Sequence, residues 1–526
     1  MKKSIALCLS LILCLSILGT AHAETITYPL STDTELTYWV DMTNTLFAVM
    51  ESYNEHIVWN KWQENTGVKL NFEHPAAGMA KEDFGLMLVS GELPDIIQEF
   101  GSYYTGGIQA GYEDGLVMDL TDLVKEYAPD YYKLISQNED TWRQFTVNDR
   151  ILSFNVWNEE ENVSSKCILM RQDWLDEFGL KAEDMTTYDA YEKYFQAILD
   201  NKPGVVPLYL TVTPNNSSSS VNNTIYWGYN IQPDWCHIGD EVIYYDKGNL
   251  ENYRAWMERM HAWYEKGYIS QDFASYTYAD SRAKFSAGTV GCYVVNVGPG
   301  VSDADASGIP IVKCPLWRVN ADDAVNVCYY EGFERNGQHG TVITTACKDP
   351  ITAVKLLNYG YTDEGMYLSN YGVEGVSYTV DESGKRVFTD TVYKNPTYGT
   401  TLTMYIYRIH YMPNRRLADV TSNPAITIRP EVVAMRKQYT EISDKLNGNY
   451  IMPTSVALTS EENAERSGIM QNADTYIAEM RLKFITGVVE INDATWSEYL
   501  TTLYDTYKLS RALEITQAAY NRYIGK

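Results

Sequence analysis

Catalytic signatures are missing from this chain of 526 residues. It contains no H-E-x-x-H zinc motif, no G-x-S-x-G elbow, no phosphate-binding G-x-x-x-x-G-K-[ST] loop and no G-x-G-x-x-G. The seven histidines are scattered singly. Because metalloproteases, α/β-hydrolases, ATPases and dinucleotide enzymes depend on these spacings, we predict no catalytic residues, no metal site and no cofactor.

Basic charge is also scarce. Lysine and arginine number 42 against 69 aspartates and glutamates, which gives a formal net charge of −27. Such a chain repels nucleic acid and anionic lipid head groups, so we exclude nucleic acid as a partner. The absence of any obvious cluster of basic residues also favours neutral sugars over acidic ones as ligands.

Cysteine gives little information. Six cysteines follow residue 23, at wide spacings and without a C-x-x-C pair. Neither a zinc site nor a thioredoxin-like motif is indicated, and the sequence leaves open whether these thiols form disulfides or stay reduced.

Long apolar runs are absent except near the start. A basic beginning and the apolar run 5–18 precede Ala21-His22-Ala23, which has the small-x-small pattern of a signal peptidase site. We therefore predict a signal peptide, residues 1–23, and export to the periplasm, cell surface or medium. Cys8 and Cys14 both follow leucine rather than a small residue, so we expect no lipid anchor.

Aromatic residues are plentiful, with 43 tyrosines and 12 tryptophans. Their rings offer flat apolar faces to the C–H faces of pyranose rings, while their polar tips hydrogen-bond hydroxyl groups. Much of this aromatic content must serve core packing, but it is also the composition that sugar-binding clefts use.

Strand and helix patterns alternate in the first hundred residues, and the length of the chain favours two or three domains. Strands are expected at 36–40, 68–72 and 93–97, with helices at 59–66 and 81–89 between them. This order predicts parallel β-α-β units and an α/β fold. Later helices are expected to begin at three caps: Thr186 with Asp189, Asp349 before Pro350, and Thr495 with Glu498.

Seven stretches, in order along most of the chain, carry a resemblance to a known family. They are SGELPDII at 90–97, GLVMDLT at 115–121, MRQDWL at 170–175, YEKGYI at 264–269, TDEG at 362–365, NYGVEGV at 370–376 and LEITQAAYNRY at 513–523. Together they resemble the extracellular solute-binding protein family 1, in its aldouronate-type branch, which is similar to alginate-binding proteins. Related receptors often carry a calcium loop where this chain has 200–205, which lacks the alternating oxygen ligands, so we expect no structural calcium.

The resemblance implies a two-lobe α/β fold of the periplasmic-binding-protein-like (type II) kind, with discontinuous lobes and a helix-rich C-terminal part. By resemblance, residues 24–155 and 286–345 form lobe 1, and residues 156–285 and 346–526 form lobe 2. It further implies a monomer that binds its ligand between the lobes, closes, and delivers it to a membrane-embedded ABC importer permease.

Candidate ligand contacts are polar or aromatic residues that follow predicted strands, lie near the lobe crossings, or occur in the Tyr-Gly-x-Glu-Gly motif. They are Trp39, Asp41, Glu99, Tyr103, Tyr104, Asn155, Trp157, Trp227, Asn296, Tyr371 and Glu374. Three other tryptophans, Trp174, Trp256 and Trp263, fall on helical faces and are expected to pack in the core.

Three functions are compatible with this pattern. The leading hypothesis is an oligosaccharide receptor without catalysis. A receptor for a peptide or another small solute on the same scaffold is the first alternative. An exported carbohydrate-active enzyme is the second, since a glycosidase needs only two facing carboxylates, which no spacing rule excludes among 69 acidic residues.

Overall fold

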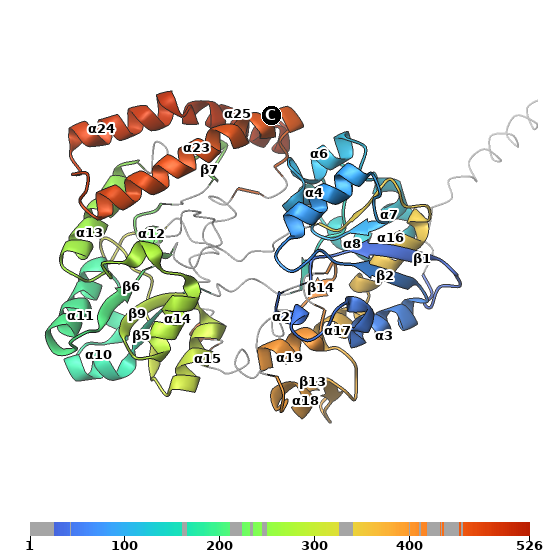
Figure 1. Cartoon of the computed structure of the whole chain (residues 1–526), viewed down its shortest axis with the longest axis horizontal. Coiled ribbons are helices and arrows are strands. Elements are labelled where there is room, and N and C mark those ends of the chain that lie inside the picture. The colour runs from blue at the N-terminus through green and yellow to red at the C-terminus, as the bar shows by residue number, and fades with distance from the viewer. Residues whose placement is uncertain are drawn as a thin grey trace, which may run out of the picture.

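A computed structural model of the chain provides the three-dimensional description. It describes residues 26–42, 44–159, 166–210, 224–231, 235–244, 250–325, 340–398, 400–409, 412–417, 432, 434–435, 452–453 and 456–526. The predicted signal peptide lies outside these residues. Figure 1 shows the elements gathered into two α/β units, each built around one sheet.

The first unit contains a four-stranded sheet in the order β11-β3-β1-β2. Its strands are β1 Glu35–Trp39, β2 Lys69–Glu73, β3 Ile96–Ile97 and β11 Val342–Ile343. β1 is parallel to both β2 and β3, whereas β11 runs antiparallel to β3. Along β2 exposed and buried side chains alternate strictly, as expected for a strand with one buried face.

Helices α3 Ile57–Thr66 and α4 Ala80–Ser90 connect these strands, as the sequence predicts. Gly67 and Gly91 end them in the left-handed conformation, at φ 74° and 72°. The other elements of the unit are α2 Asn44–Phe47, η1 Tyr53–Glu55, α5 Phe100–Tyr103, α6 Gly107–Glu113, α7 Thr121–Tyr127, α8 Pro129–Ile135, α9 Glu139–Phe145, β4 Trp157–Asn158, α16 Pro350–Asn358, η5 Tyr359–Tyr361, α17 Asp363–Tyr371, β12 Tyr378–Val380, β13 Arg386–Phe388, α18 Asp390–Tyr393, α19 Thr400–Ile406 and β14 Arg415–Arg416.

The second unit contains a four-stranded sheet in the order β10-β5-β9-β6. Its strands are β5 Lys166–Arg171, β6 Val206–Tyr209, β9 Val290–Asn296 and β10 Ile311–Lys313. β6 is parallel to β9, and β5 is antiparallel to both β9 and β10. Around the sheet lie α10 Gln172–Phe178, η2 Ala182–Asp184, α11 Tyr188–Asn201, α12 Thr224–Trp227, β7 Cys236–Ile238, β8 Glu241–Ile243, α13 Leu250–Glu265, η4 Phe273–Ser275, α14 Tyr278–Ser286 and α15 Val297–Ser307.

The C-terminal part is helical, as predicted. It consists of α23 Ser460–Ile485, α24 Asp493–Thr501, a π-helical turn Thr502–Thr506 and α25 Leu509–Tyr523. These helices share one hydrophobic core with the second sheet and α13, in which Trp256 and Trp263 are fully buried. In Figure 1, α25 reaches back towards α6 of the first unit.

The predicted lobe boundaries need two corrections. β9 and β10, placed in lobe 1 from the sequence, belong to the second sheet. Helices α16 and α17, placed in lobe 2, pack instead on the core of the first sheet through residues such as Ala353, Leu357 and Leu368. A buried apolar run fits either sheet equally well, so only long-range pairing decides the unit to which it belongs.

Two of the three predicted helix caps lie at other residues. Asp349 does cap α16, and its side chain accepts a hydrogen bond from Thr352 N at 3.1 Å. The α11 cap is Thr187 rather than Thr186, and the α24 cap is Asn492 rather than Thr495. Neighbouring Thr, Ser and Asn residues are chemically equivalent as caps, so sequence alone leaves this choice open.

Cys167, Cys236, Cys292, Cys314 and Cys347 are buried thiols, while Cys328 lies outside the described residues. Among the residues that the structure describes, no helix has the length and apolar content to cross a bilayer.

We expect Gly365→Ala to lower the free energy of unfolding by about 1–3 kcal/mol, the usual cost of overpacking a core. A Cβ at Gly365 would lie 1.9 Å from the Tyr359 carbonyl oxygen, a backbone atom that cannot move aside. Gly468→Ala is the matched control, because nothing lies within 4 Å of its Cβ position in α23. That variant should gain roughly 1 kcal/mol from helix propensity. Denaturant titration followed by circular dichroism measures both, and equal effects would contradict the packing argument.

Candidate ligand-binding site

The first sheet has a topological switch point between β1 and β3. The chain leaves β1 for β2 on one side, and then crosses to β3 on the other side. Loops that leave the carboxyl ends of two such strands diverge and open a crevice, where α/β proteins bind ligands. Asp41 lies two residues beyond β1 and Glu99 two residues beyond β3. In Figure 1, α2, which follows β1, lies on the side of this unit that faces the second unit.

Asp41 and Tyr103 form the first polar contact at this edge. The Tyr103 hydroxyl donates to Asp41 Oδ2 at 3.4 Å. Burial raises the pKa of the Asp41 carboxyl, and the Tyr103 hydrogen bond partly offsets that rise. Trp39 lies edge-on to Tyr103, with 5.2 Å between the ring centroids, and is only 4% exposed. Trp39 therefore packs against the Tyr103 ring, and its own ring is too buried to stack on a ligand.

Glu99 is held in an uncommon backbone conformation. Its φ of 55° is left-handed, which costs a non-glycine residue about 1–3 kcal/mol. The residue is half-buried. Its negative charge, with that of Asp41, helps to raise the pKa of the Tyr103 hydroxyl, although burial is the main cause. Strain of this kind is common at ligand-binding sites, and here it occurs two residues after β3, at the switch point.

His74 fixes the end of β1. Its Nδ1–H donates to the Val40 carbonyl at 2.9 Å, and its Nε2 accepts from Tyr53 N–H at 3.0 Å. Burial lowers the pKa of His74, so the ring is neutral, and the donor–acceptor pair assigns the tautomer. Asp41 directly follows Val40 and is thereby anchored.

A second set of hydrogen bonds in the first unit lies around the last turn of α17. Ser369 O accepts from Ile409 N–H at 3.1 Å. The Asn370 side chain makes two hydrogen bonds to the segment 415–417. Its amide nitrogen donates to Arg415 O at 2.8 Å, and its amide oxygen accepts from Leu417 N–H at 3.0 Å. Two neighbouring residues of one helix thus hold the segments 408–409 and 415–417 side by side.

Histidine and tyrosine side chains connect the two ends. The His56 ring bonds the Tyr405 carbonyl oxygen at 3.0 Å and lies 5.5 Å from the Tyr53 ring. Charge on Asp41 contributes to the raised pKa of Tyr53, which is mainly an effect of burial. Tyr53 and His56 therefore connect the acidic end at Asp41 with the segment 405–409.

Of the predicted contacts, four lie together at the switch point: Trp39, Asp41, Glu99 and Tyr103. Two others, Trp157 and Tyr371, lie near β14 in the same unit. Trp157, in β4, pairs directly with Arg415 and is 9% exposed. Tyr371 ends α17, and its ring stacks on Phe388 with the centroids 5.2 Å apart.

The other five predicted contacts lie elsewhere. Tyr104 donates to Asp114 Oδ2 at 2.6 Å, away from Asp41, and Glu374 is exposed in a turn beside Tyr378. Asn155 is 3% exposed and bonds Tyr131 inside the first core. Trp227 is fully buried in the second core, and Asn296 ends β9 in the second unit. Trp174, Trp256 and Trp263 are buried, as predicted.

Sequence reasoning did not single out Tyr53, His56 and His74, whose contacts hold the end of β1 in place.

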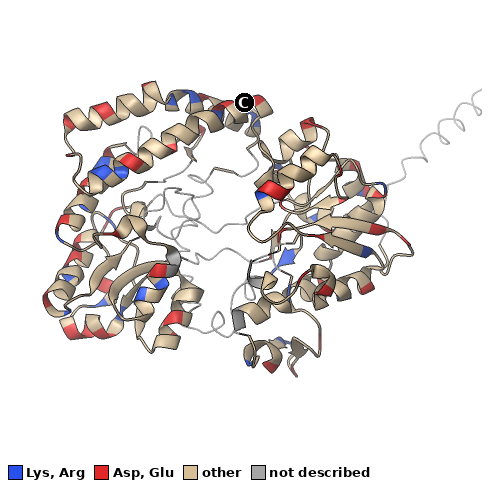
Figure 2. Ribbon diagram, viewed as in Figure 1, with Lys and Arg blue, Asp and Glu red and all other residues tan. Residues whose placement is uncertain are grey.

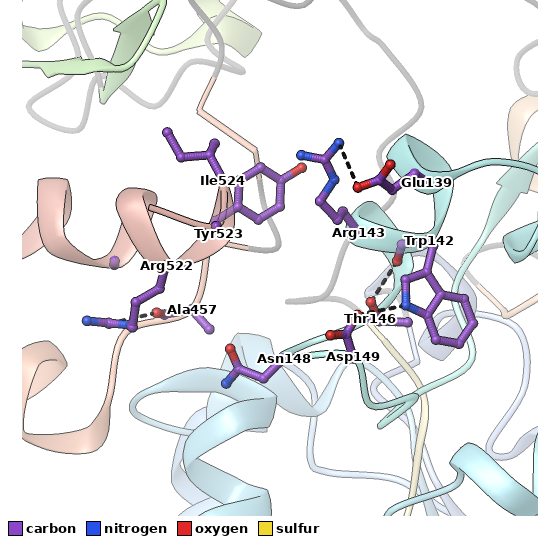
Figure 3. Close-up of a pocket in the computed structure, with 12 residues that line it drawn as sticks. Glu139, Trp142, Arg143, Thr146, Asn148, Asp149, Ala457, Arg522, Tyr523 and Ile524 are labelled. Carbon is purple, nitrogen blue, oxygen red and sulfur yellow. Dashed lines mark hydrogen bonds and ion pairs between the residues drawn. The ribbon is translucent and has the colours of Figure 1, made fainter.

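A cavity of about 260 Å³ lies where α25 meets the first unit (Figure 3). The first unit contributes Trp142, Arg143 and Asp149, and α25 and its end contribute Arg522 and Tyr523. Trp142 Nε1 donates to Asp149 Oδ1 at 3.0 Å, and Figure 3 shows the Tyr523 ring pointing towards Arg143. Because its walls come from different units, the cavity changes shape whenever the units move relative to one another.

No group of three His, Cys, Asp or Glu side chains within the described ranges is arranged to hold a metal ion.

Comparisons with known proteins identify relatives of the whole arrangement. The profile of the family described as bacterial extracellular solute-binding protein matches residues 48–367. The polygalacturonan/rhamnogalacturonan-binding protein YtcQ of Bacillus subtilis (strain 168) is 24% identical over 315 residues. That match covers 57% of this chain and only 59% of the length of the relative.

Two solved structures share the fold. The alginate-binding protein AlgQ2, in its crystal structure without calcium ion, aligns at TM-score 0.71 and 20% identity over 95% of this chain and 100% of its own. A HMO-binding solute-binding protein from Bifidobacterium longum infantis ATCC 15697 aligns at TM-score 0.74 and 13% identity over 93% and 99% of the two chains. The family resemblance and the type II periplasmic-binding-protein-like fold are thereby confirmed.

We expect Asp41→Asn to raise the melting temperature at pH 7 and to leave it unchanged near pH 3. The folded-state pKa of Asp41 lies above its ordinary value of 3.8, so stability falls as the pH rises through that interval. Below 3.8 the carboxyl is protonated in both states and contributes no difference. The control is Asp33→Asn, an exposed position before β1. Scanning calorimetry at both pH values measures these melting temperatures. A melting temperature of Asp41→Asn below that of the wild type at pH 7 would contradict the view that the Asp41 carboxylate is destabilised by burial.

Proposed function

Because this chain belongs to the bacterial extracellular solute-binding proteins, we propose that it captures an oligosaccharide between its two α/β units and delivers it to an ABC importer, without catalysis. The observation that carries this proposal is the half-buried edge formed by Asp41, Glu99 and Tyr103 at the switch point of the first sheet. Carboxylate oxygens accept hydrogen bonds from sugar hydroxyls, and a tyrosine offers both a hydroxyl and a ring.

The position of this edge supports capture between the units. It lies on the side of the first unit that faces the second unit (Figure 1). A ligand that touches both units stabilises the closed arrangement, so binding shifts an equilibrium between open and closed forms. The importer then recognises the closed form. The relatives named above, described as binding polygalacturonan, rhamnogalacturonan, alginate or HMO, support an oligosaccharide as the ligand class.

The proposal extends to the location and partners of the protein. The chain is exported after removal of residues 1–23, carries no lipid anchor, acts as a monomer outside the cytoplasm, and has a membrane-embedded permease as its partner.

Mass spectrometry of the exported protein tests the processing step. The expected product begins at Glu24 and carries no acyl modification, because Leu13 before Cys14 does not fit a lipoprotein signal. A product that begins at a lipid-modified Cys14 would contradict this part of the proposal and leave the binding function intact.

Calorimetric titration of the mature chain with neutral and acidic oligosaccharides tests the binding function. We expect one sugar class to bind and Tyr103→Phe to weaken that binding about 2–10-fold, the usual worth of one neutral hydrogen bond. The control Glu374→Gln, at an exposed turn outside the site, should bind like the wild type.

Chromatography of the recovered ligand separates the alternatives. Intact sugar agrees with a receptor, whereas cleaved sugar would indicate an exported carbohydrate-active enzyme. Binding of peptides alone would replace the oligosaccharide proposal with the other receptor class.

A further inference from the structure

Two histidines, His74 and His56, pack against Tyr53 near the half-buried edge at the switch point of the first sheet. Their ring centroids lie 5.1 Å and 5.5 Å from that of Tyr53, and both rings meet it edge to face. His74 follows β2, and His56 precedes α3. Because Val40, which His74 contacts, directly precedes Asp41, the two imidazoles are connected to a carboxylate of this edge.

Both nitrogens of His74 bond backbone groups of fixed polarity. Nδ1 lies 2.9 Å from the Val40 carbonyl oxygen, which can only accept a hydrogen bond. Nε2 lies 3.0 Å from the Tyr53 N–H, which can only donate, and the Ser52 hydroxyl is a second donor to Nε2 at 3.2 Å. The ring therefore carries one proton, on Nδ1, and joins the end of β1 to the backbone of η1.

His56 is fixed in the same way but in the opposite tautomer. Its Nδ1 accepts from the N–H groups of Val58 and Trp59 at 3.3 and 3.4 Å, and so caps α3. Its Nε2–H donates to the Tyr405 carbonyl oxygen at 3.0 Å. The residue is 1% exposed. This buried ring therefore joins the start of α3 to α19.

A second proton on either ring would have no acceptor. On His74 it would occupy Nε2 and point at the Tyr53 N–H. On His56 it would occupy Nδ1 and point at the first N–H groups of α3, where the helix dipole also opposes a positive charge. In both cases a backbone hydrogen bond is lost and an N–H group is left without its acceptor.

The groups that face His74 leave it neutral at neutral pH. Burial lowers the pKa of the ring below its ordinary value of 6.5, and the Val40 hydrogen bond and the Asp41 carboxylate offset only part of that effect. Glu73, the preceding residue, is exposed. The Tyr53 hydroxyl is uncharged, because burial raises its pKa.

The groups that face His56 act in the same direction. Burial lowers its pKa to about 4, although the Tyr405 and Arg408 carbonyl groups partly oppose this change. Arg408 is still positively charged at neutral pH, because burial lowers its pKa only to about 9, and Glu55 is exposed. Figure 2 shows acidic residues spread over the helices of both units, and their negative field attracts protons. Local contacts therefore outweigh the charge of the whole chain.

We propose that His74 and His56 form an acid-sensitive joint, which holds the switch-point edge in place at neutral pH and loosens it, with weaker ligand binding, in acidic surroundings. The inference rests on the proposed function and adds its regulation. His74 is a positioning residue, because it fixes Val40 and thereby Asp41. His74 is half-buried and His56 fully buried, so the edge loosens before the cap of α3 is lost.

The direction of the pH effect follows from linkage. In the unfolded chain both rings take up a proton near 6.5, and in the folded chain they do so only at lower pH. The folded state is therefore progressively disfavoured as the pH falls below 6.5, down to about 4 for His56. A ligand that requires the ordered edge binds the form with neutral rings, so its affinity decreases over the same interval.

Nitrogen-15 NMR of the mature chain, labelled at histidine, tests the joint without any ligand. We expect His74 in the Nδ1–H tautomer and His56 in the Nε2–H tautomer at pH 7.5, with both rings titrating below pH 6.5. His74→Gln and His56→Asn assign the two signals. The opposite tautomer at either ring, or a charged ring at pH 7.5, would overturn the inference.

Titration calorimetry at pH 7.5 and pH 5 tests the effect on binding, with oligosaccharides of polygalacturonan, alginate and HMO as probes. The wild type should bind about 2–10-fold more weakly at pH 5, the usual worth of one neutral hydrogen bond. His74→Gln keeps a donor and an acceptor that do not titrate. It should bind like the wild type at pH 7.5 and lose most of the pH effect. His74→Phe lacks both hydrogen bonds and should bind weakly at both pH values.

His261→Gln, which removes a histidine from α13 in the second unit, is the matched control and should keep the wild-type pH profile. Equal pH dependence in the wild type and His74→Gln would assign the effect to the Asp41 carboxyl, whose pKa burial raises, and would overturn the joint. A lower melting temperature of His74→Phe with unchanged binding would make His74 merely structural, with the same consequence. If no oligosaccharide binds the wild type at pH 7.5, the proposed function fails, whereas the NMR tautomers still decide the hydrogen bonds of the joint.

Discussion

The parallel pairing of β1 with both β2 and β3 is the constraint on which the rest of the site depends. It places β1 between two strands whose connections leave in opposite directions, and so opens the crevice at their carboxyl ends. Asp41 and Glu99 are then brought together from positions 58 residues apart in the chain. The neutral His74 ring keeps this geometry by tying Val40 to the backbone of Tyr53.

Charge is distributed unevenly over this region. One end presents half-buried carboxylates, where burial raises the pKa of Asp41 and backbone strain holds Glu99. The other end presents Arg408 and Arg416, which lack acidic partners among the described residues. Between them lie tyrosines. The groups at both ends can exchange hydrogen bonds with the hydroxyl groups of a ligand.

Local sequence signals predicted much of the first unit correctly. Strand and helix alternation located β1, α3, β2, α4 and β3 to within a few residues, because each element satisfies its own periodicity. Asp349 before Pro350 correctly predicted the start of α16. The polar residues that follow strands, such as Asp41, Glu99 and Tyr103, were found for the same reason, since a strand end can be recognised without knowing which strand lies beside it.

By itself, the sequence determined the α/β fold class, the helical C-terminal part and the polar residues that follow β1 and β3, because these follow from local periodicity and from polar residues after strands. Tertiary structure alone decided that β9 pairs in the second sheet, that Trp227 is buried, and that Asn370 of α17 bonds the segment 415–417. Hydrophobic periodicity encodes whether a residue is buried but not the partner against which it is buried. Contacts between distant segments therefore depend on how whole elements pack.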